Sequence, residues 1–155
     1  MKIREAVSPD LVFLGLRASD AAEAIAAVAH ELAGTTGLAA EAVSEALGER
    51  EKLGSTSVGN GFAIPHCKLD DLEDIVVALA RFETGVEFGG NQHNEPVTFF
   101  FVVLSPPDRP AEHLQVLSQI ARILKNGELR SELSTVTDVD AVVAAVERAA
   151  DREGL

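Results

Sequence analysis

The sequence predicts an α/β fold in which helices pack on both faces of a central β-sheet, within a single domain that spans residues 1–155. Two runs, at residues 75–82 (IVVALARF) and 97–104 (VTFFFVVL), are almost continuously apolar and rich in strand-forming residues. Such runs are typical of central strands that are covered on both faces. Segments with helical periodicity precede and follow them, and no repeat or linker divides the chain.

The first part of the chain predicts a short strand followed by two helices, at residues 11–16, 20–33 and 39–52. Asp20 and Glu23 resemble a capping box with Asp in place of Ser or Thr, which indicates where the first helix begins. Gly34 is expected to end that helix, because glycine readily takes the left-handed conformation of a helix C-terminus.

The part of the chain after the second apolar run predicts a loop and two helices. Residues 105–110 (SPPDRP) hold three prolines and cannot form regular structure. A stripe of apolar residues predicts a helix over residues 111–124 that stops near Gly127. A last helix is expected from about Asp138, with Thr137 as its N-cap.

The composition is that of a soluble globular protein, with 46% hydrophobic and 25% charged residues. The longest strongly apolar run has far too few residues to span a bilayer, and the N-terminus has no apolar stretch typical of a signal peptide. The single cysteine, Cys67, excludes an internal disulfide framework. It fits a reducing compartment, so we expect a cytoplasmic protein.

Thirteen basic and 25 acidic residues give the chain a formal net charge of −12. A surface so acidic repels phosphate backbones and anionic lipids, so neither nucleic acid nor a membrane is expected as a direct partner. The charge favours a protein partner with a basic face. The alternative, that the acidity only keeps the protein soluble, stays open.

The most informative segment is residues 54–66 (GSTSVGNGFAIPH), where a glycine-rich run leads to a histidine that follows a proline. Glycines let backbone N–H groups approach an anion closely, and the proline restricts the chain next to His66. Gly59, Asn60 and Gly61 could supply backbone N–H groups to a phosphoryl group, and Ser55, Thr56 and Ser57 could supply hydroxyls. The segment therefore suggests phosphoryl chemistry on histidine.

A histidine that accepts a phosphoryl group must be neutral, with one ring nitrogen free and the other held by a hydrogen bond. His66 is the candidate, and Arg50 could bind the phosphoryl oxygens through two hydrogen bonds. An alternative stays open at this point. The SVGNG run could be a plain hairpin turn, and His66 a structural residue.

The other histidines and motifs give weaker signals. His30 and His93 are expected to be solvated, whereas His113 lies in the first turn of a predicted helix, where the helix dipole favours a neutral ring. Phosphate-loop, dinucleotide and hydrolase motifs are absent, and no ligand spacing supports a zinc site. Cys67 is expected to pack rather than to react. Neither a metal nor a cofactor is therefore expected.

These residues resemble a known family. The matching positions are Arg50-Glu51, Gly54-Ser55-Thr56, Gly59-Asn60-Gly61 and Ala63-Ile64-Pro65-His66, with His113-Leu114, Leu117, Ile120-Ala121 and Leu124 as a second, weaker match. The pattern resembles the fructose/mannitol-type enzyme IIA of the bacterial phosphoenolpyruvate-dependent phosphotransferase system. The resemblance covers roughly residues 11–133 and implies a mixed β-sheet flanked by helices on both faces.

Carried over to this chain, the resemblance makes His66 the phosphoryl acceptor, His113 the histidine that contacts the phosphoryl group, and Arg50 the arginine beside it. Thr56 and Asn60 match polar positions of the loop around the phosphate. The implied donor is the histidine phosphocarrier protein, and the implied acceptor is an enzyme IIB. No nucleotide or metal takes part in this step.

Three residues depart from the family's usual pattern: Ser57 in place of glycine, Phe62 in place of an aliphatic residue, and Cys67 directly after the acceptor histidine. A positive φ at Ser57 would be costly. None of the three removes a group that the chemistry needs. They leave the shape of the loop open.

Three functions compete. The chain shows no fused IIB, IIC or phosphocarrier domain and looks similar to the stand-alone nitrogen-regulatory enzyme IIA, which acts on regulatory target proteins through its phosphorylation state. The first alternative is a sugar-specific enzyme IIA that passes its phosphoryl group to a IIB during uptake. The second is a binding module of the same fold that is never phosphorylated; the presence of both His66 and His113 argues against it.

Overall fold

The computed structural model describes residues 1–88 and 95–155. The predicted loop residue His93 lies outside these ranges. In chain order the elements are α1 (Ile3–Ala6), the 3-10 helix η1 (Pro9–Leu11), β1 (Val12–Leu16), α2 (Ala21–Thr36), α3 (Ala40–Lys52), β2 (Ser57–Gly59), β3 (Phe62–Ala63), β4 (His66–Lys68), β5 (Val76–Val86), β6 (Val97–Ser105), α4 (Pro110–Ile123), α5 (Gly127–Thr135) and α6 (Val139–Arg152).

The strands form one mixed sheet in the order β1-β5-β6-β3-β2, and β4 also pairs with β6. The two long strands, β5 and β6, are antiparallel to each other at the centre. By contrast, β1 is parallel to β5, and both β3 and β4 are parallel to β6. The mixed α/β sheet expected from the sequence is confirmed.

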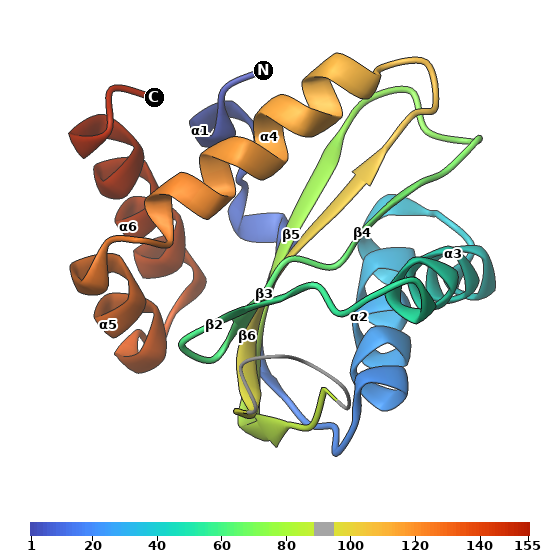
Figure 1. The fold of residues 1–155 in the computed structure, drawn as a ribbon, viewed down its shortest axis with the longest axis horizontal. Coiled ribbons are helices and arrows are strands. Elements are labelled where there is room, and N and C mark those ends of the chain that lie inside the picture. The colour runs from blue at the N-terminus through green and yellow to red at the C-terminus, as the bar shows by residue number, and fades with distance from the viewer. Residues whose placement is uncertain (89–94) are drawn as a thin grey trace.

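Helices cover both faces of this sheet (Figure 1). Along β6 the side chains alternate between two hydrophobic clusters: Phe99 and Phe101 belong to one, and Phe100 and Val102 to the other. The first cluster also holds the buried residues of α1, α4, α5 and α6, and the second holds those of α2 and α3. The continuous apolar run therefore marks a strand buried on both faces, as predicted.

Two helix ends differ from the predictions. Gly34 does not end α2: the helix continues to Thr36, and Gly37 takes the left-handed conformation at φ 79°. The N-cap of α6 is Asp138, whose side chain accepts a hydrogen bond from the backbone N–H of Ala141, and not Thr137. A short carboxylate reaches this donor well, so Asp serves as well as Thr there.

Some of the observed helices and strands were not predicted from the sequence. Asn126 caps α5 by accepting from two backbone N–H groups, so the segment after Gly127 is helical where a simple stop was expected. The short strands β2, β3 and β4 also escaped prediction, because two or three residues carry no periodicity of their own.

Residues 57–63 form a β-hairpin, in which β2 and β3 pair antiparallel. Gly59, Asn60 and Gly61 all have positive φ, at 89°, 58° and 84°. These are the residue types that take this conformation at low cost, as an Asn-Gly hairpin turn requires. The alternative that the SVGNG run forms a hairpin turn is thus confirmed. Ser57 has no positive φ, so the cost that glycine would avoid at this position does not arise.

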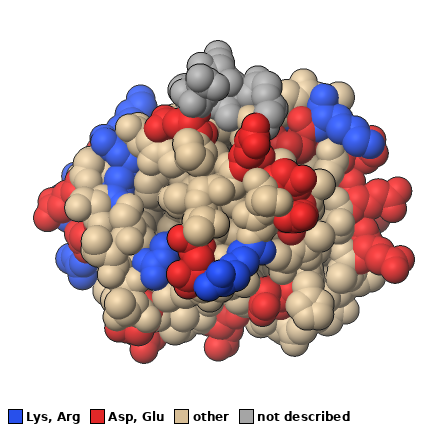
Figure 2. Space-filling view, turned by 90° about the horizontal axis from the view of Figure 1, so that it is seen from below, with Lys and Arg blue, Asp and Glu red and all other residues tan. Residues whose placement is uncertain are grey.

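Acidic and basic side chains are interspersed on the face of the molecule that Figure 2 shows, around a central area without charge. On this face the acidic side chains are not gathered into one patch. Among the described residues, no helix combines the length and the apolar character that crossing a bilayer requires.

Candidate functional site

His66 is the first residue of β4, where it lies opposite Val103 of β6. Its Nδ1 is 2.8 Å from the backbone carbonyl oxygen of Ile64, two residues earlier. A carbonyl oxygen can only accept, so Nδ1 carries the proton and donates it. In the neutral ring, Nε2 is then unprotonated and keeps its lone pair free for a nucleophilic attack.

His113 lies in the first turn of α4, as predicted, and is buried at 7% exposure. Its ring faces that of His66, with 5.5 Å between the centroids and 55° between the planes. Its Nδ1 is 2.5 Å from Oγ of Ser105, the last residue of β6. The fold therefore brings together two histidines that lie 47 residues apart in sequence.

Both histidines line one open cavity of about 640 Å³ between α3, β4 and α4. Two cations also line it: Arg50 from the last turn of α3 and Lys68 from β4. Arg50 donates through Nη1 to the carbonyl of Gly54 at 3.0 Å, which leaves other guanidinium N–H groups for an anion. The remaining lining residues are Ala46, Glu49, Leu53, Cys67, Leu114 and Leu117.

Both rings are held in the neutral form. Burial lowers the pKa of His66, and the nearby charge of Arg50 lowers it further against the opposing effects of the Ile64 hydrogen bond and of Glu51. Burial also lowers the pKa of His113, with smaller contributions from His66 and Lys68. At neutral pH the cavity thus offers a free imidazole nitrogen beside two cations, an arrangement suited to phosphoryl transfer.

Comparison with known families bears directly on this site. Residues 5–149 match the family model of the phosphoenolpyruvate-dependent sugar phosphotransferase system, EIIA 2. The chain belongs to this family. The resemblance noted from the sequence is confirmed, and the enzyme IIA family is one of phosphotransfer components that work through phosphohistidine.

Individual relatives match this enzyme IIA over nearly its whole length. It is 35% identical to the nitrogen regulatory protein of Bradyrhizobium diazoefficiens over 146 residues, which cover 94% of this chain and 95% of that protein. The solved nitrogen regulatory protein IIA-Ntr from Neisseria meningitidis superimposes with a TM-score of 0.85 at 30% identity, over 93% of this chain and 98% of that one. The mannitol IIA from Escherichia coli gives 0.76 at 25% identity, over 90% and 98%.

The structure does not place the glycine turn of this enzyme IIA in the histidine cavity. Gly59 and Asn60 line a different hollow, against Lys125 and Arg130. The backbone N–H of Asn60 donates to the Glu95 carboxylate at 2.7 Å. The predicted cradle of backbone donors from Gly59, Asn60 and Gly61 is therefore not formed around His66, because these residues turn the hairpin.

Among the predicted hydroxyl donors, Thr56 already donates within the loop, whereas Ser55 acts there only as an acceptor. The Glu51 carboxylate accepts from the backbone N–H of Thr56 at 2.7 Å and from its Oγ1 at 2.5 Å. Oγ of Ser55 accepts from the backbone N–H of Ser57. None of Ser55, Thr56 and Ser57 lines the cavity, and the hydrogen bonds of Ser55 and Thr56 stabilise the loop that follows α3.

Lys68 and Ser105 escaped notice in the sequence, although each carries a signal. Lys68 lies two residues after His66 on the same strand, and alternate residues of a strand share a face. Ser105 is a polar residue at the end of an apolar strand and directly precedes a proline-rich loop. A buried serine at such a position needs a hydrogen-bond partner, and that partner is His113.

Cys67 is buried and packs with the cluster formed by α2 and α3, as expected of a packing residue. Burial raises the pKa of its thiol to about 12, so no thiolate forms at neutral pH. Within residues 1–88 and 95–155, no three His, Cys, Asp or Glu side chains gather in a way that could hold a metal ion.

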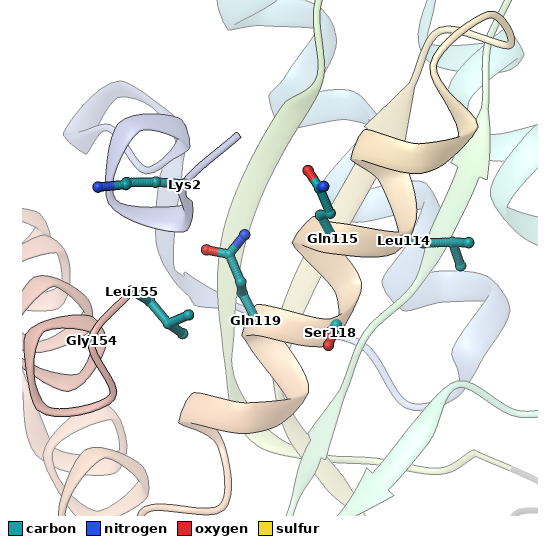
Figure 3. A pocket seen from close by; sticks show the side chains of 7 residues that line it. All are labelled: Lys2, Leu114, Gln115, Ser118, Gln119, Gly154 and Leu155. Atoms are coloured by element: carbon teal, nitrogen blue, oxygen red, sulfur yellow. The ribbon is translucent and has the colours of Figure 1, made fainter.

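A second hollow lies beside α4, between this helix and the two chain termini (Figure 3). It is lined by Lys2, Gln115, Gln119 and Leu155 among others, and neither histidine takes part. Leu114 lines both hollows, and Figure 3 shows its side chain on the side of α4 away from Lys2 and Leu155. This hollow and the histidine cavity therefore lie on different sides of α4.

Proposed function

We propose that this enzyme IIA is a phosphoryl carrier with a regulatory role. His66 accepts a phosphoryl group from the phosphorylated histidine phosphocarrier protein, and the phosphorylation state of this chain then acts on target proteins. The observation that carries the proposal is the hydrogen bond from Nδ1 of His66 to Ile64, which leaves Nε2 free in a cavity that also holds His113 and two cations.

In the proposed step, the lone pair of Nε2 forms a bond to phosphorus while the P–N bond of the donor histidine breaks. The electron pair of the broken bond returns to the donor's nitrogen. The proton on Nδ1 of His66 stays in place, and the Ile64 carbonyl stabilises the positive charge that the ring gains. Arg50 and Lys68 offset the charge of the phosphoryl oxygens, and His113 contacts one of them.

Two alternatives share this site. A sugar-specific enzyme IIA would pass the phosphoryl group on to a cysteine of an enzyme IIB, with the same first step. The regulatory role is favoured because the relative that matches over 94% of this chain is a nitrogen regulatory protein, and because the structure of IIA-Ntr superimposes better than that of IIA mannitol. A binding module that is never phosphorylated would not require a free Nε2.

The deciding experiment is incubation of the protein with phosphoenolpyruvate, enzyme I and the phosphocarrier protein, followed by intact mass measurement. We expect one added phosphoryl group that is lost in acid, because P–N bonds are acid-labile. His66→Ala should abolish the gain, and His30→Ala should keep it, because His30 is exposed on α2 and does not line the cavity. No gain, or a gain that survives His66→Ala, would refute the proposal.

A chase with IIB domains from the same cell separates the two roles. A label that none of these domains discharges supports regulation. Rapid and complete discharge by one of them would assign the chain to sugar uptake instead.

A further inference from the structure

Ser105 differs from the other serines of the chain in its surroundings. Among the described residues, three polar residues are buried as a whole: Thr56, Ser105 and His113. Thr56 bonds to Glu51, whereas Ser105 and His113 bond to each other. Ser105 is 0% exposed, so it cannot touch a partner protein or a phosphoryl group, and its hydroxyl reaches the cavity only through the His113 ring.

The bond between Ser105 and His113 can run in two directions. If Nδ1 of His113 donates to Oγ, the other ring nitrogen, Nε2, carries a lone pair. If the hydroxyl donates to Nδ1, Nε2 carries a proton instead. The direction decides whether the cavity side of His113 repels or attracts a phosphoryl oxygen.

The surroundings of Ser105 decide between these directions. In the first, the hydroxyl proton would need another acceptor, and within the described part of the chain Oγ has His113 as its hydrogen-bond partner and no other. A buried donor without an acceptor costs about 1–3 kcal/mol. In the second direction the hydroxyl proton is donated to Nδ1 of His113. Lone pairs of Oγ then have no hydrogen-bond donor, but the first direction also leaves a lone pair of Oγ without one.

We propose that Ser105 is a positioning residue for phosphoryl transfer: its hydroxyl donates to Nδ1 of His113 and so fixes this ring with the proton on Nε2, ready to donate to the phosphoryl group on His66. The inference rests on the proposed function and names the residue that prepares the donor. His66 and His113 then carry their protons on opposite nitrogens: Nδ1 in His66, set by Ile64, and Nε2 in His113, set by Ser105.

Opposite tautomers in one protein give a direct test. Two-dimensional ¹H–¹⁵N spectra that correlate ring nitrogens with carbon-bound ring protons identify the protonated nitrogen of each histidine. They are recorded above the pH range where the rings titrate and assigned with His66→Ala and His113→Ala. We expect the proton on Nδ1 of His66 and on Nε2 of His113. A proton on Nδ1 of His113 would overturn the proposal.

Transfer kinetics test the consequence. Removing a hydrogen-bond donor to the transition state typically lowers kcat 10²–10³-fold. In Ser105→Ala the donor His113 is still present but its ring is no longer held, so the loss should be smaller, and we expect kcat to fall about tenfold. KM for the phosphocarrier should not change, because Ser105 is fully buried. A kcat within about twofold of that of the unchanged protein would refute the role.

The matched control is Ser57→Ala, which removes another buried serine hydroxyl, one without a hydrogen-bond partner among the described residues. It should leave kcat unchanged and the Nδ1 resonance of His113 in place, whereas Ser105→Ala should move that resonance. If the unchanged protein takes no phosphoryl group at all, the proposed function fails. The ring spectra still decide in that case whether Ser105 sets the tautomer of His113.

Discussion

The two hydrogen bonds between Glu51 and Thr56 should contribute a large part of the stability of the loop that leads to His66. One carboxylate oxygen accepts from the backbone N–H of Thr56 and the other from its hydroxyl, at 2.7 and 2.5 Å. Thr56 is buried at 6% exposure, so both donors lose their acceptor in Glu51→Ala without full access to water. The variant should therefore unfold more easily.

The magnitude follows from the two bonds. A hydrogen bond to a charged group contributes about 1.5–3 kcal/mol, and the lower end applies because Glu51 is only partly buried. We therefore expect Glu51→Ala to lower the free energy of unfolding by about 3 kcal/mol. For a chain of this size, 1 kcal/mol corresponds to about 3 °C, so the melting temperature should fall by about 9 °C.

Urea unfolding followed by circular dichroism measures this change, and a double-mutant cycle with Thr56→Val isolates the hydroxyl bond. We expect a coupling of about 1 kcal/mol between the two sites. Lys52→Ala is the control, because the Lys52 side chain lies next to Glu51 in sequence, is exposed, and forms an ion pair with Glu49 that water screens. A loss below about 1 kcal/mol in Glu51→Ala, or strictly additive effects, would refute the reasoning.

Three other predictions concern the site and α2. His113→Ala should keep phosphorylation but slow it about 10²-fold, because a donor and not the nucleophile is removed; rapid-quench rates equal to those of the unchanged protein would count against this. Because the pKa of His66 is lowered, the transfer rate should reach half its maximum at a pH below the ordinary histidine value of ~6.5, as Nε2 takes up a proton; a midpoint above that value contradicts the structure. Gly34→Ala should raise the free energy of unfolding by about 0.5–1 kcal/mol in denaturant titrations, and Gly37→Ala should lower it, since only Gly37 has a positive φ; the reverse order would place the end of α2 at Gly34.

The fold was predictable from the sequence where a segment is long and its pattern is strong. The runs that became β5 and β6 are almost continuously apolar, and α4 has an apolar residue at every third or fourth position, so both patterns predict buried elements. The ends of α2 were less predictable. Gly34 and Gly37 are both glycines near the end of the helical pattern, and tertiary context decides which of them takes the left-handed conformation.

The sequence was enough to predict which histidines and which arginine lie near one another, but not the contacts between the residues of the candidate site. His66, His113 and Arg50 do line one cavity. The positions of His66 and Lys68 relative to Ser105 depend on the register of β4 against β6, which pairs Lys68 with Ser105 and His66 with Val103. That register cannot be read from a three-residue strand, because its length carries too little pattern to fix a pairing.

The glycine-rich run matches a family motif, but its glycines have a different structural role from the one that the sequence suggested. Its glycines were expected to let an anion approach the backbone, yet Gly59, Asn60 and Gly61 serve a turn with three positive φ values in succession. The turn sends the chain back, so that β3 starts at Phe62 beside Phe99 and the following residues run along β6 until His66 lies opposite Val103. A side chain at Gly59 or Gly61 would strain the turn and shift this path. The glycines therefore influence the candidate site from a distance, because they fix where β3, the strand that leads to His66, begins.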